Sequence, residues 1–367
     1  MITQNLIDYV DSLQDDGSNL PLTFDQAMSF EYLYKAYIKC KKGVMWKDSV
    51  LSFSEHSIDE VTKLANQIAE GTYKLRNPHI FTIHGPKVRN IVSMWIGDRV
   101  VQRSLCDNVI YPIMTKKLIY ANVACQKGKG TDCGRNLLKK YLHKIYSEKC
   151  NNDFYCLQID IKGYYPNMRH DYIEYLFRKD LDDTTYFMVK KMLDAHYPGT
   201  IGYNPGSQLI QIAGICGLNE FDHFCKEKLH CRYYIRYMDD IIILSRDKSF
   251  LQNALNSIHM ELAKIGFRVN PKKTRIYHQN HFIDFLGFKY RLSDTGKEII
   301  LVNGKSVKRA RKHWKNMSRA IDNHKYKELT NVKLVQSIET YKDYIQRATS
   351  SKSLIAKIKE LLIQCLK

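Results

Sequence analysis

The stretch "CRYYIRYMDDIIILS", residues 231–245, most constrains the fold, because two adjacent aspartates interrupt a run that otherwise favours burial. The segments "RYYIRY" and "IIILS" are rich in β-branched and aromatic residues and predict two short strands. The "MDD" between them is too short for anything but a tight hairpin turn, so we expect Asp239 and Asp240 at its tip. Two carboxylates crowded at one turn repel each other, and a divalent cation would remove that repulsion.

A third acid ends another predicted strand. Asp160, in "FYCLQIDIKGYYPNM", follows β-branched and aromatic residues and precedes a turn with Gly and Pro. Antiparallel pairing of this strand with the hairpin would bring Asp160 close to Asp239 and Asp240. Such a cluster suits two magnesium ions, roughly 3.5–4 Å apart, that activate a 3′-hydroxyl and stabilise a leaving pyrophosphate. The alternative interpretation is that these acids only cap strands and turns.

The net charge of the chain points to a polyanionic partner. The formal charge is +19, and the segment from Lys305 to Lys367 contains sixteen Lys and Arg against five Asp and Glu. A second basic cluster runs from Lys116 to Lys149. Release of counterions from phosphates would drive binding, so the two basic segments predict the walls of a nucleic-acid groove. A solvated basic surface is the competing interpretation.

The composition argues against several other classes. No segment approaches the roughly 18 apolar residues of a membrane span, and the acidic start "MITQNLIDYVDSLQDDGSN" does not read as a secretory signal. We therefore expect a cytoplasmic protein without a membrane partner. The ten cysteines include no CxxC pair, which favours reduced thiols over disulfides or a zinc site.

Hydrophobic periodicity predicts a mixture of helices and strands. Residues 1–75 are mostly helical, including a helix that starts at a Ser57 cap and ends near Gly71. The segment "HIFTIHGPKVRNIVSMW" alternates on both sides of "HGPK" and predicts a hairpin. Further helices are predicted at residues 99–117 and 170–195, and in the segment that leads into the "RYYIRY" strand.

The order of these segments resembles a reverse transcriptase of the bacterial retroelement type. "YMDD" between apolar strands, preceded by "DIKGYYPNMRH", is similar to the palm of these enzymes. "HGPKVRNIVSMWIGDRVVQRSLCDNVIYPI" resembles their fingers, and "YANVACQKGKGT" resembles the motif that follows. "GFRVNPKKTRI" and "FLGF" resemble the segments that close the palm and grip the primer, and "SIETYKDYIQRATS" resembles the thumb.

The resemblance implies an α/β (α+β) right-hand polymerase fold. It consists of fingers, a palm of antiparallel sheet plus helices, and a helical thumb. Residues 1–75 would form an N-terminal helical extension and the start of the fingers, and residues 76–155 the fingers. Residues 156–300 would form the palm with the catalytic motifs, and residues 301–367 the basic helical thumb.

The resemblance also assigns catalytic roles. Asp160 and Asp239 would bind both metal ions, and Asp240 would complete the negative cluster. Lys273, in "NPKKT", corresponds to a lysine that can donate a proton to the leaving pyrophosphate, with its neighbour Lys272 as the rival for that role.

Other residues would bind the nucleotide and the primer. Tyr165 stands where the family places an aromatic side chain that stacks under the sugar and excludes a 2′-hydroxyl. Lys87 and Arg89, on the fingers hairpin, would contact the incoming triphosphate, since an Arg fork matches phosphate oxygens. The primer grip would consist of Phe285, Leu286 and Gly287.

One segment departs from the common pattern of the bacterial relatives. Where many of these carry a QGxxxSP loop, this chain has "PGSQLIQIAGICGLNEFDHF". Aligning Gly206 with the loop glycine places Ile210 at the serine and Gln211 at the proline, while Pro205 replaces the glutamine. Gly206 and Gln211 are expected near the nucleotide, with Gln208 as a substitute polar contact. A glutamine at the proline position, here Gln211, resembles the loop of diversity-generating retroelement enzymes and of defence-associated (unknown-group) reverse transcriptases.

These observations lead to one expected function and several alternatives. We expect an RNA-directed DNA polymerase that uses magnesium and dNTPs to copy a dedicated structured non-coding RNA into DNA, in bacterial antiphage defence. An accessory protein or a second copy of the chain would be further partners. The alternatives are a diversity-generating reverse transcriptase, an untemplated or protein-primed DNA polymerase, and a non-catalytic RNA-binding scaffold.

Overall fold

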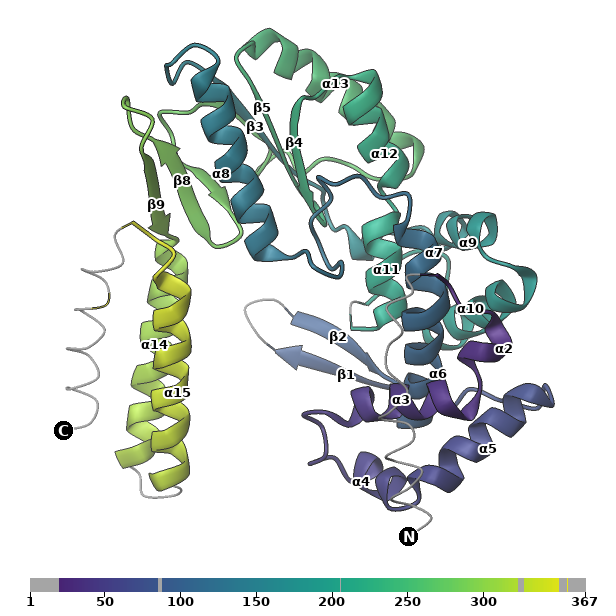
Figure 1. Ribbon diagram of the computed structural model, residues 1–367. Coiled ribbons are helices and arrows are strands. Elements are labelled where there is room, and N and C mark those ends of the chain that lie inside the picture. The colour runs from purple at the N-terminus through teal and green to yellow at the C-terminus, as the bar shows by residue number, and fades with distance from the viewer. Residues whose placement is uncertain (1–19, 85–87, 205, 323–326, 350–354, 356–367) are drawn as a thin grey trace. The chain divides into compact units, whose positions relative to one another are not determined.

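The computed structural model describes residues 20–84, 88–204, 206–322, 327–349 and 355 (Figure 1). These residues form two compact units, each assembled from separate stretches of chain. The first unit contains the described residues up to Gly128 together with Asp160–Leu229 and Ser257–Asn270. The second contains Lys129–Ile159, His230–Asn256 and the described residues from Pro271 onward. The chain therefore passes between the two units several times.

The first unit is largely helical, and its core lies where α3 packs against α6 and α5. Leu33 and Tyr37 of α3 and Val100 and Leu105 of α6 are almost fully buried. Its helical segments are α2 (Phe24–Ala27), α3 (Phe30–Lys41), α4 (Asp48–Glu55), α5 (Ser57–Ala69), α6 (Ile96–Leu105), η1 (Cys106–Ile110), α7 (Tyr111–Thr115), η2 (Tyr165–Asn167), α9 (His170–Asp180), α10 (Asp183–His196), α11 (Gln208–Cys216), α12 (Asn219–His223) and η3 (Phe224–Lys228). The predicted helices are present in the described residues, and the part of the prediction that covers residues 1–19 lies outside them.

The expected cap of α5 is one residue out of place. The N-cap position is His56, and Ser57 is the first helical residue without a capping hydrogen bond. The chain leaves the helix at Gly71, whose φ of +72° is a left-handed conformation that glycine adopts without steric strain.

The predicted fingers hairpin is confirmed. β1 (His79–His84) pairs antiparallel with β2 (Val88–Ser93), from His79 opposite Ser93 to His84 opposite Val88. Every residue of β1 is exposed. Figure 1 shows the two strands as a ribbon of their own. The "GPK" turn lies outside the described residues.

The second unit is built around a four-stranded sheet in the order β4-β5-β3-β6. Its strands are β3 (Tyr155–Asp160), whose last residue belongs to the first unit, β4 (Tyr233–Tyr237), β5 (Asp240–Ser245) and β6 (Arg275–His278). The β4–β5 and β3–β6 pairs are antiparallel. Helix α8 (Thr131–Ser147) packs against β4 and β5. The apolar residues 241–244 of β5 are buried, as the sequence predicts.

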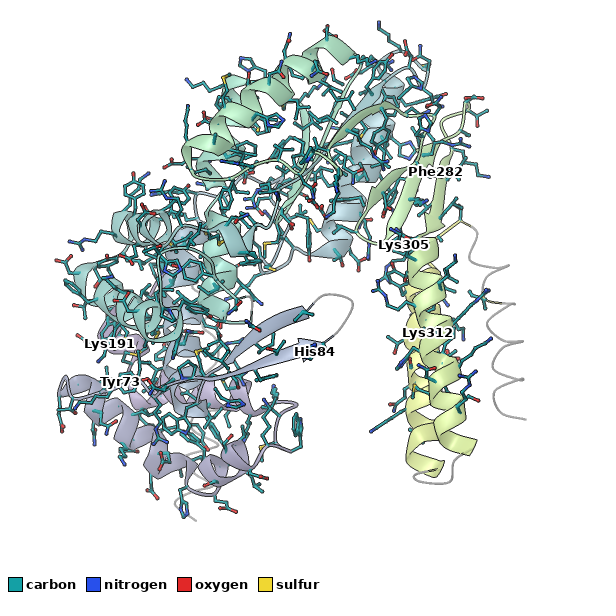
Figure 2. The ribbon with its side chains drawn as sticks, turned by 180° about the vertical axis from the view of Figure 1, so that it is seen from behind. Tyr73, His84, Lys191, Phe282, Lys305 and Lys312 are labelled. Carbon is teal, nitrogen blue, oxygen red and sulfur yellow. The ribbon has the colours of Figure 1, made fainter. Side chains whose placement is uncertain are left out.

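A second sheet and a helix pair complete this unit. The sheet has the order β7-β8-β9, formed by β7 (Ile283–Phe285), β8 (Phe288–Leu292) and β9 (Glu298–Val302). Helices α14 (Gly304–Asp322) and α15 (Lys327–Ile345) pack along each other (Figures 1 and 2). Their shared core contains Trp314, Leu334, Ile338 and Ile345. One further helix, α13 (Lys248–Lys264), contributes residues to both units.

The expected fold class is confirmed, since the chain combines helices with antiparallel sheets. The boundaries of the four predicted domains remain predictions. Nine of the ten cysteines lie in the described ranges, and all nine are free thiols. Among the described helices, none is both long and apolar enough to cross a bilayer.

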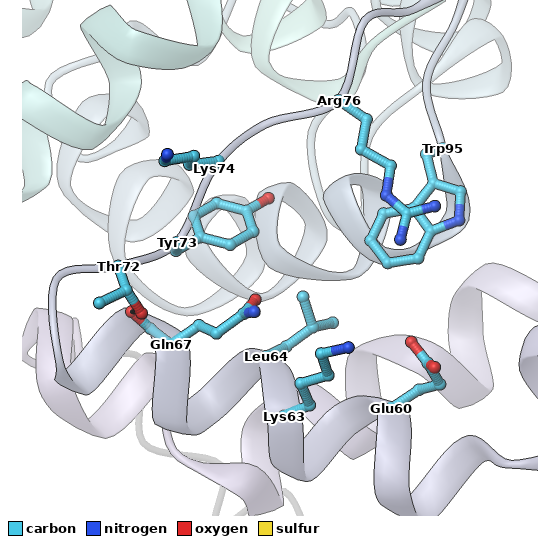
Figure 3. A pocket seen from close by; sticks show the side chains of 9 residues that line it. All are labelled: Glu60, Lys63, Leu64, Gln67, Thr72, Tyr73, Lys74, Arg76 and Trp95. Atoms are coloured by element: carbon cyan, nitrogen blue, oxygen red, sulfur yellow. Dashed lines mark hydrogen bonds between the residues drawn. The ribbon is translucent and has the colours of Figure 1, made fainter.

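A buried carboxylate connects the start of α6 to the segment between α5 and β1. Asp98 is fully buried and accepts hydrogen bonds from Tyr73 Oη at 2.6 Å and from the Arg76 amide nitrogen at 3.0 Å. Burial raises the pKa of Asp98, while these two hydrogen bonds oppose the rise. The guanidinium of Arg76 stacks 3.7 Å above the Trp95 ring at the rim of a cavity of about 190 Å³ (Figure 3). The acid thus satisfies two donors that would otherwise be unpaired.

Replacing Asp98 should destabilise the first unit. Asp98→Ala leaves the Tyr73 hydroxyl and the Arg76 amide without an acceptor, which we expect to lower the free energy of unfolding by about 2–4 kcal/mol. Asp98→Asn should fall between this variant and the wild type, because one amide oxygen still accepts a hydrogen bond. Urea unfolding of the full chain measures the difference. Equal midpoints for wild type and Asp98→Ala would contradict the assigned role.

Candidate active site

The β4–β5 hairpin places the two adjacent aspartates differently from each other. The register pairs Tyr237 with Asp240, so the connecting turn contains only Met238 and Asp239. The expectation that both acids lie at the tip is therefore wrong for Asp240, which is the first residue of β5. Met238 has a φ of +55°, a conformation that residues other than glycine adopt rarely. The turn that carries Asp239 is therefore strained at the preceding residue, Met238.

A buried arginine supports this turn from within the sheet. Arg236, on β4, is fully buried, and its Nη1 donates to the carbonyl oxygen of Met238 at 3.2 Å. Arg236 is not among the residues predicted from the sequence. The available signal was a charged residue in a strand of otherwise buried residues, because such a charge requires partners in the interior.

Asp160 is fixed by a neighbouring asparagine. It is the last residue of β3 and is buried. Its Oδ2 accepts from Asn270 Nδ2 at 2.9 Å, and its carbonyl oxygen accepts from the Asn270 amide nitrogen at 2.7 Å. Asn270 belongs to the "GFRVNPKKTRI" segment, and it orients the carboxylate of Asp160 from outside the strand.

The sheet order brings the strands that carry the three acids together. β3 and β5 are hydrogen-bonded neighbours, and Asp160 ends the first of them while Asp240 begins the second. Within the described ranges, the structure contains no group of three or more His, Cys, Asp or Glu side chains placed to hold a metal ion. The convergence of Asp160, Asp239 and Asp240 on metal ions therefore stays a prediction.

Tyr165 packs closely over a glycine of α11. A Cβ atom added at Gly214 would lie 2.8 Å from Tyr165 Oη, so no larger residue fits beneath the ring. The neighbouring Tyr164 donates its hydroxyl to the Gly214 carbonyl oxygen at 2.6 Å. These contacts hold the half-buried Tyr165 close to the backbone of α11. The role of Tyr165 in selecting sugars stays a prediction.

The start of α11 explains the departure from the family loop. Gly206 has a φ of +143°, and Ser207 caps the helix by accepting from the Ile210 amide at 3.4 Å. Ile210 is fully buried, so the position aligned with the family serine faces the core. Gln211 is exposed and lines a cavity of about 300 Å³. Pro205 lies outside the described residues, and of the aligned positions that the structure describes, Gln211 is the one whose side chain lines the cavity.

An acid that lines this cavity, Asp107, accepts hydrogen bonds from three side chains. Asp107 accepts from Gln208 Nε2 at 2.5 Å, from Arg103 Nε at 2.9 Å and from Lys39 Nζ at 3.2 Å. Burial works against ionisation of Asp107, but the hydrogen bonds from Gln208 and Arg103 outweigh it and lower the pKa. The side-chain nitrogen of Gln208 therefore donates to Asp107, and in this structure it is not available as a contact for a substrate.

The predicted phosphate-contacting lysines and arginine fall in three places. Lys87 lies outside the described residues, and so does the side chain of Arg89, although Arg89 itself belongs to β2. Lys272 and Lys273 are both exposed in the turn that precedes β6. Exposure does not distinguish these two lysines, and the assignment of Lys273 as a proton donor stays a prediction.

The predicted primer grip forms a second tight turn. Phe285 ends β7 and pairs with Phe288 at the start of β8, so the turn consists of Leu286 and Gly287. Phe285 is buried, and Leu286 and Gly287 have φ values of +48° and +86°. Two successive positive φ values are typical of the primed turns of hairpins. These three residues thus form one tight corner between β7 and β8.

Comparison with known proteins identifies the family. Residues 84–290, more than half of the chain, match the family model described as reverse transcriptase (RNA-dependent DNA polymerase). The chain belongs to this family, and the matched region contains all three predicted catalytic aspartates. The expected family is therefore confirmed, and the activity of the chain stays a proposal.

Solved structures also match, whereas no curated protein sequence does. Among 275 matching chains is telomerase from Candida albicans in complex with a TWJ fragment of telomeric RNA. It shares 12% sequence identity at a TM-score of 0.48, and the match covers 80% of this chain and 62% of the telomerase chain.

The lowered pKa of Asp107 makes a pH-dependent prediction. A carboxylate whose pKa is lower in the folded state stabilises the fold above its unfolded pKa of about 3.9, and this contribution is lost as the pH falls through the folded value. We expect Asp107→Asn to reduce stability at pH 7 by about 1–3 kcal/mol and to flatten the further loss below about pH 4. Acid titration followed by circular dichroism measures both effects. Parallel acid-unfolding curves would rule out this role.

Proposed function

We propose that this chain copies an RNA template into DNA at a site formed by Asp160, Asp239 and Asp240. The observation that carries the proposal is the sheet order, in which the strand ending at Asp160 lies beside the strand beginning at Asp240. The family match across these strands supports it. The substrates are a primer with a free 3′-hydroxyl and dNTPs, and the products are extended DNA and pyrophosphate.

The donor chemistry fits the two magnesium ions that we propose for this site. Three carboxylates supply hard oxygen ligands, which magnesium prefers. Bound there, the ions supply Lewis acidity toward the primer hydroxyl and toward the triphosphate. The protein holds Asp239 on the turn supported by Arg236 and holds the Asp160 carboxylate against Asn270. Lys273 would donate a proton to the leaving pyrophosphate.

The basic face of α14 supports nucleic acid as the partner. Its exposed cations are Lys305, Lys308, Arg309, Lys312, Lys315 and Arg319. In the described part of the chain, none of these six side chains forms an ion pair. Figure 2 labels Lys305 and Lys312 along this helix. Cations without acidic partners gain the most from neutralising phosphates, so this face would bind the template–product duplex.

For the biological role, we propose copying of a dedicated structured non-coding RNA in bacterial antiphage defence. The support is the start of α11, where a buried Ile210 and an exposed Gln211 replace the family's serine and proline. An accessory protein or a second copy of the chain would complete the assembly. The sequence of the DNA product separates this role from the alternatives, because untemplated synthesis gives homopolymeric or random tracts.

Removing the hairpin acids should abolish DNA synthesis while leaving RNA binding intact. We expect Asp239→Ala combined with Asp240→Ala to reduce primer extension by about 10³-fold or more, since the metal ligands are lost. Filter binding of the co-purified RNA should change less than about twofold, because phosphate contacts dominate affinity. Asp294→Ala, an exposed acid in the same unit, is the matched control. Unchanged extension by the double variant, or none by the wild type on its own RNA, would refute the proposal.

Shortening Tyr165 should relax the selection of sugars. Tyr165→Ala removes the ring that we place beneath the sugar, so incorporation of rNTPs relative to dNTPs should rise about tenfold or more. Tyr175→Ala, an exposed tyrosine on α9, serves as the control. Single-nucleotide incorporation with matched rNTP and dNTP measures the ratio. A ratio equal to that of the wild type would remove Tyr165 from this role.

A further inference from the structure

The turn of the predicted primer grip is strained at a residue that lacks the freedom of glycine. Leu286 has a φ of +48°, in the left-handed region that leucine rarely adopts, and Gly287 follows at +86°. A two-residue hairpin needs this backbone geometry, whatever side chain occupies it. The conformation of Leu286 therefore requires support from outside the hairpin.

The support comes from a buried arginine about 150 residues earlier in the chain. Arg135, on α8, donates from Nε and Nη2 to the Leu286 carbonyl oxygen at 3.2 and 2.8 Å. Its guanidinium carbon lies 4.8 Å from the centroid of the Phe288 ring. Its Nη1 donates to Asp132 Oδ1 at 2.7 Å, which balances the buried charge. Both the planar fork and the charge of Arg135 are thus used.

The same turn is also tied to α15. Tyr344 Oη donates to the Gly287 carbonyl oxygen at 3.0 Å, and the rings of Phe288 and Tyr344 lie 4.8 Å apart. A Cβ atom at Gly287 would lie 2.2 Å from Tyr344 Oη, so the close approach requires glycine. Arg347 Nη2 donates to Asp132 Oδ2 at 3.1 Å, so Asp132 joins both arginines.

We infer that Arg135 is a positioning residue of the polymerase, which orients the primer grip and couples it to helix α15. The inference rests on the proposed function, because the turn matters to chemistry only if it holds a primer end. A hydrophobic residue at position 135 would fill the space without burying a charge. The guanidinium instead meets the carbonyl of the strained residue with two donors, a geometry that lysine does not reproduce.

Two variants separate positioning from packing. Arg135→Lys keeps the charge but loses the fork, and Arg135→Met keeps most of the volume but loses every donor. Lys297→Met, an exposed lysine between β8 and β9 in the same unit, is the matched control. Thermal unfolding shows which variants are folded. Tyr344→Phe removes one hydroxyl donor to the same turn and serves as the test if the Arg135 variants do not fold.

The first measurement needs no chemistry. A DNA primer carrying 2-aminopurine at its 3′-terminal position is annealed to an RNA template and bound to the full-length protein without dNTPs. We expect Arg135→Lys and Arg135→Met to bind the duplex within about twofold of the wild type, because phosphate contacts dominate affinity. The fluorescence of the terminal base should change clearly, because the primer end is no longer held. Tyr344→Phe should change it in the same direction by less.

The second measurement is single-turnover extension of the same primer. A small misplacement of reacting groups can slow chemistry by up to about 100-fold, so we expect kcat to fall about 10- to 100-fold while the KM for dNTP changes less than about threefold. Unchanged terminal fluorescence and an unchanged rate in folded variants would overturn the inference and leave the proposed function intact. A wild type that binds the duplex but makes no DNA would overturn the proposed function, and the fluorescence would still decide the role of Arg135. A wild type that does not bind the duplex would overturn both.

Discussion

The pairing of Tyr237 with Asp240 is the constraint on which the arrangement of the site depends. It closes the β4–β5 hairpin with a turn of two residues, and β5 has a hydrogen-bonded neighbour on each side. Residues 241–244 are buried, so both faces of β5 are covered by other parts of the protein. The pairing register fixes the backbone positions of Asp239 and Asp240.

Two turns in the second unit are stabilised in the same way. Met238 and Leu286 both have positive φ values, and each carbonyl oxygen accepts from a buried arginine, Arg236 in one case and Arg135 in the other. A residue in this conformation costs on the order of 1–3 kcal/mol, and a hydrogen bond from a charged donor contributes about 1.5–3 kcal/mol. The two magnitudes are comparable, so an arginine can offset the strain of each turn. Each corner is then held in one conformation.

Local pattern was enough to predict two hairpins, the strand that ends at Asp160 and several helices. The β1–β2 and β4–β5 hairpins followed from alternation around short turns, and the predicted helices followed from their periodicity. Residues whose importance lies in distant contacts were missed. Arg135, Asn270 and Asp107 act on partners that the chain reaches only after folding, and their neighbours in sequence carry no sign of those partners.

The sequence by itself determined the strand that ends at Asp160, the hairpin that carries Asp239 and Asp240, and the basic character of the last 63 residues. These features depend on local propensity, alternation and charge, which are written along the chain. Only the tertiary structure decided that β3 lies beside β5, that Ile210 faces the core and that Arg135 holds the Leu286 turn. Each of these depends on which distant segments share a buried surface, because packing and the pairing of buried polar groups select among many arrangements that local pattern allows equally.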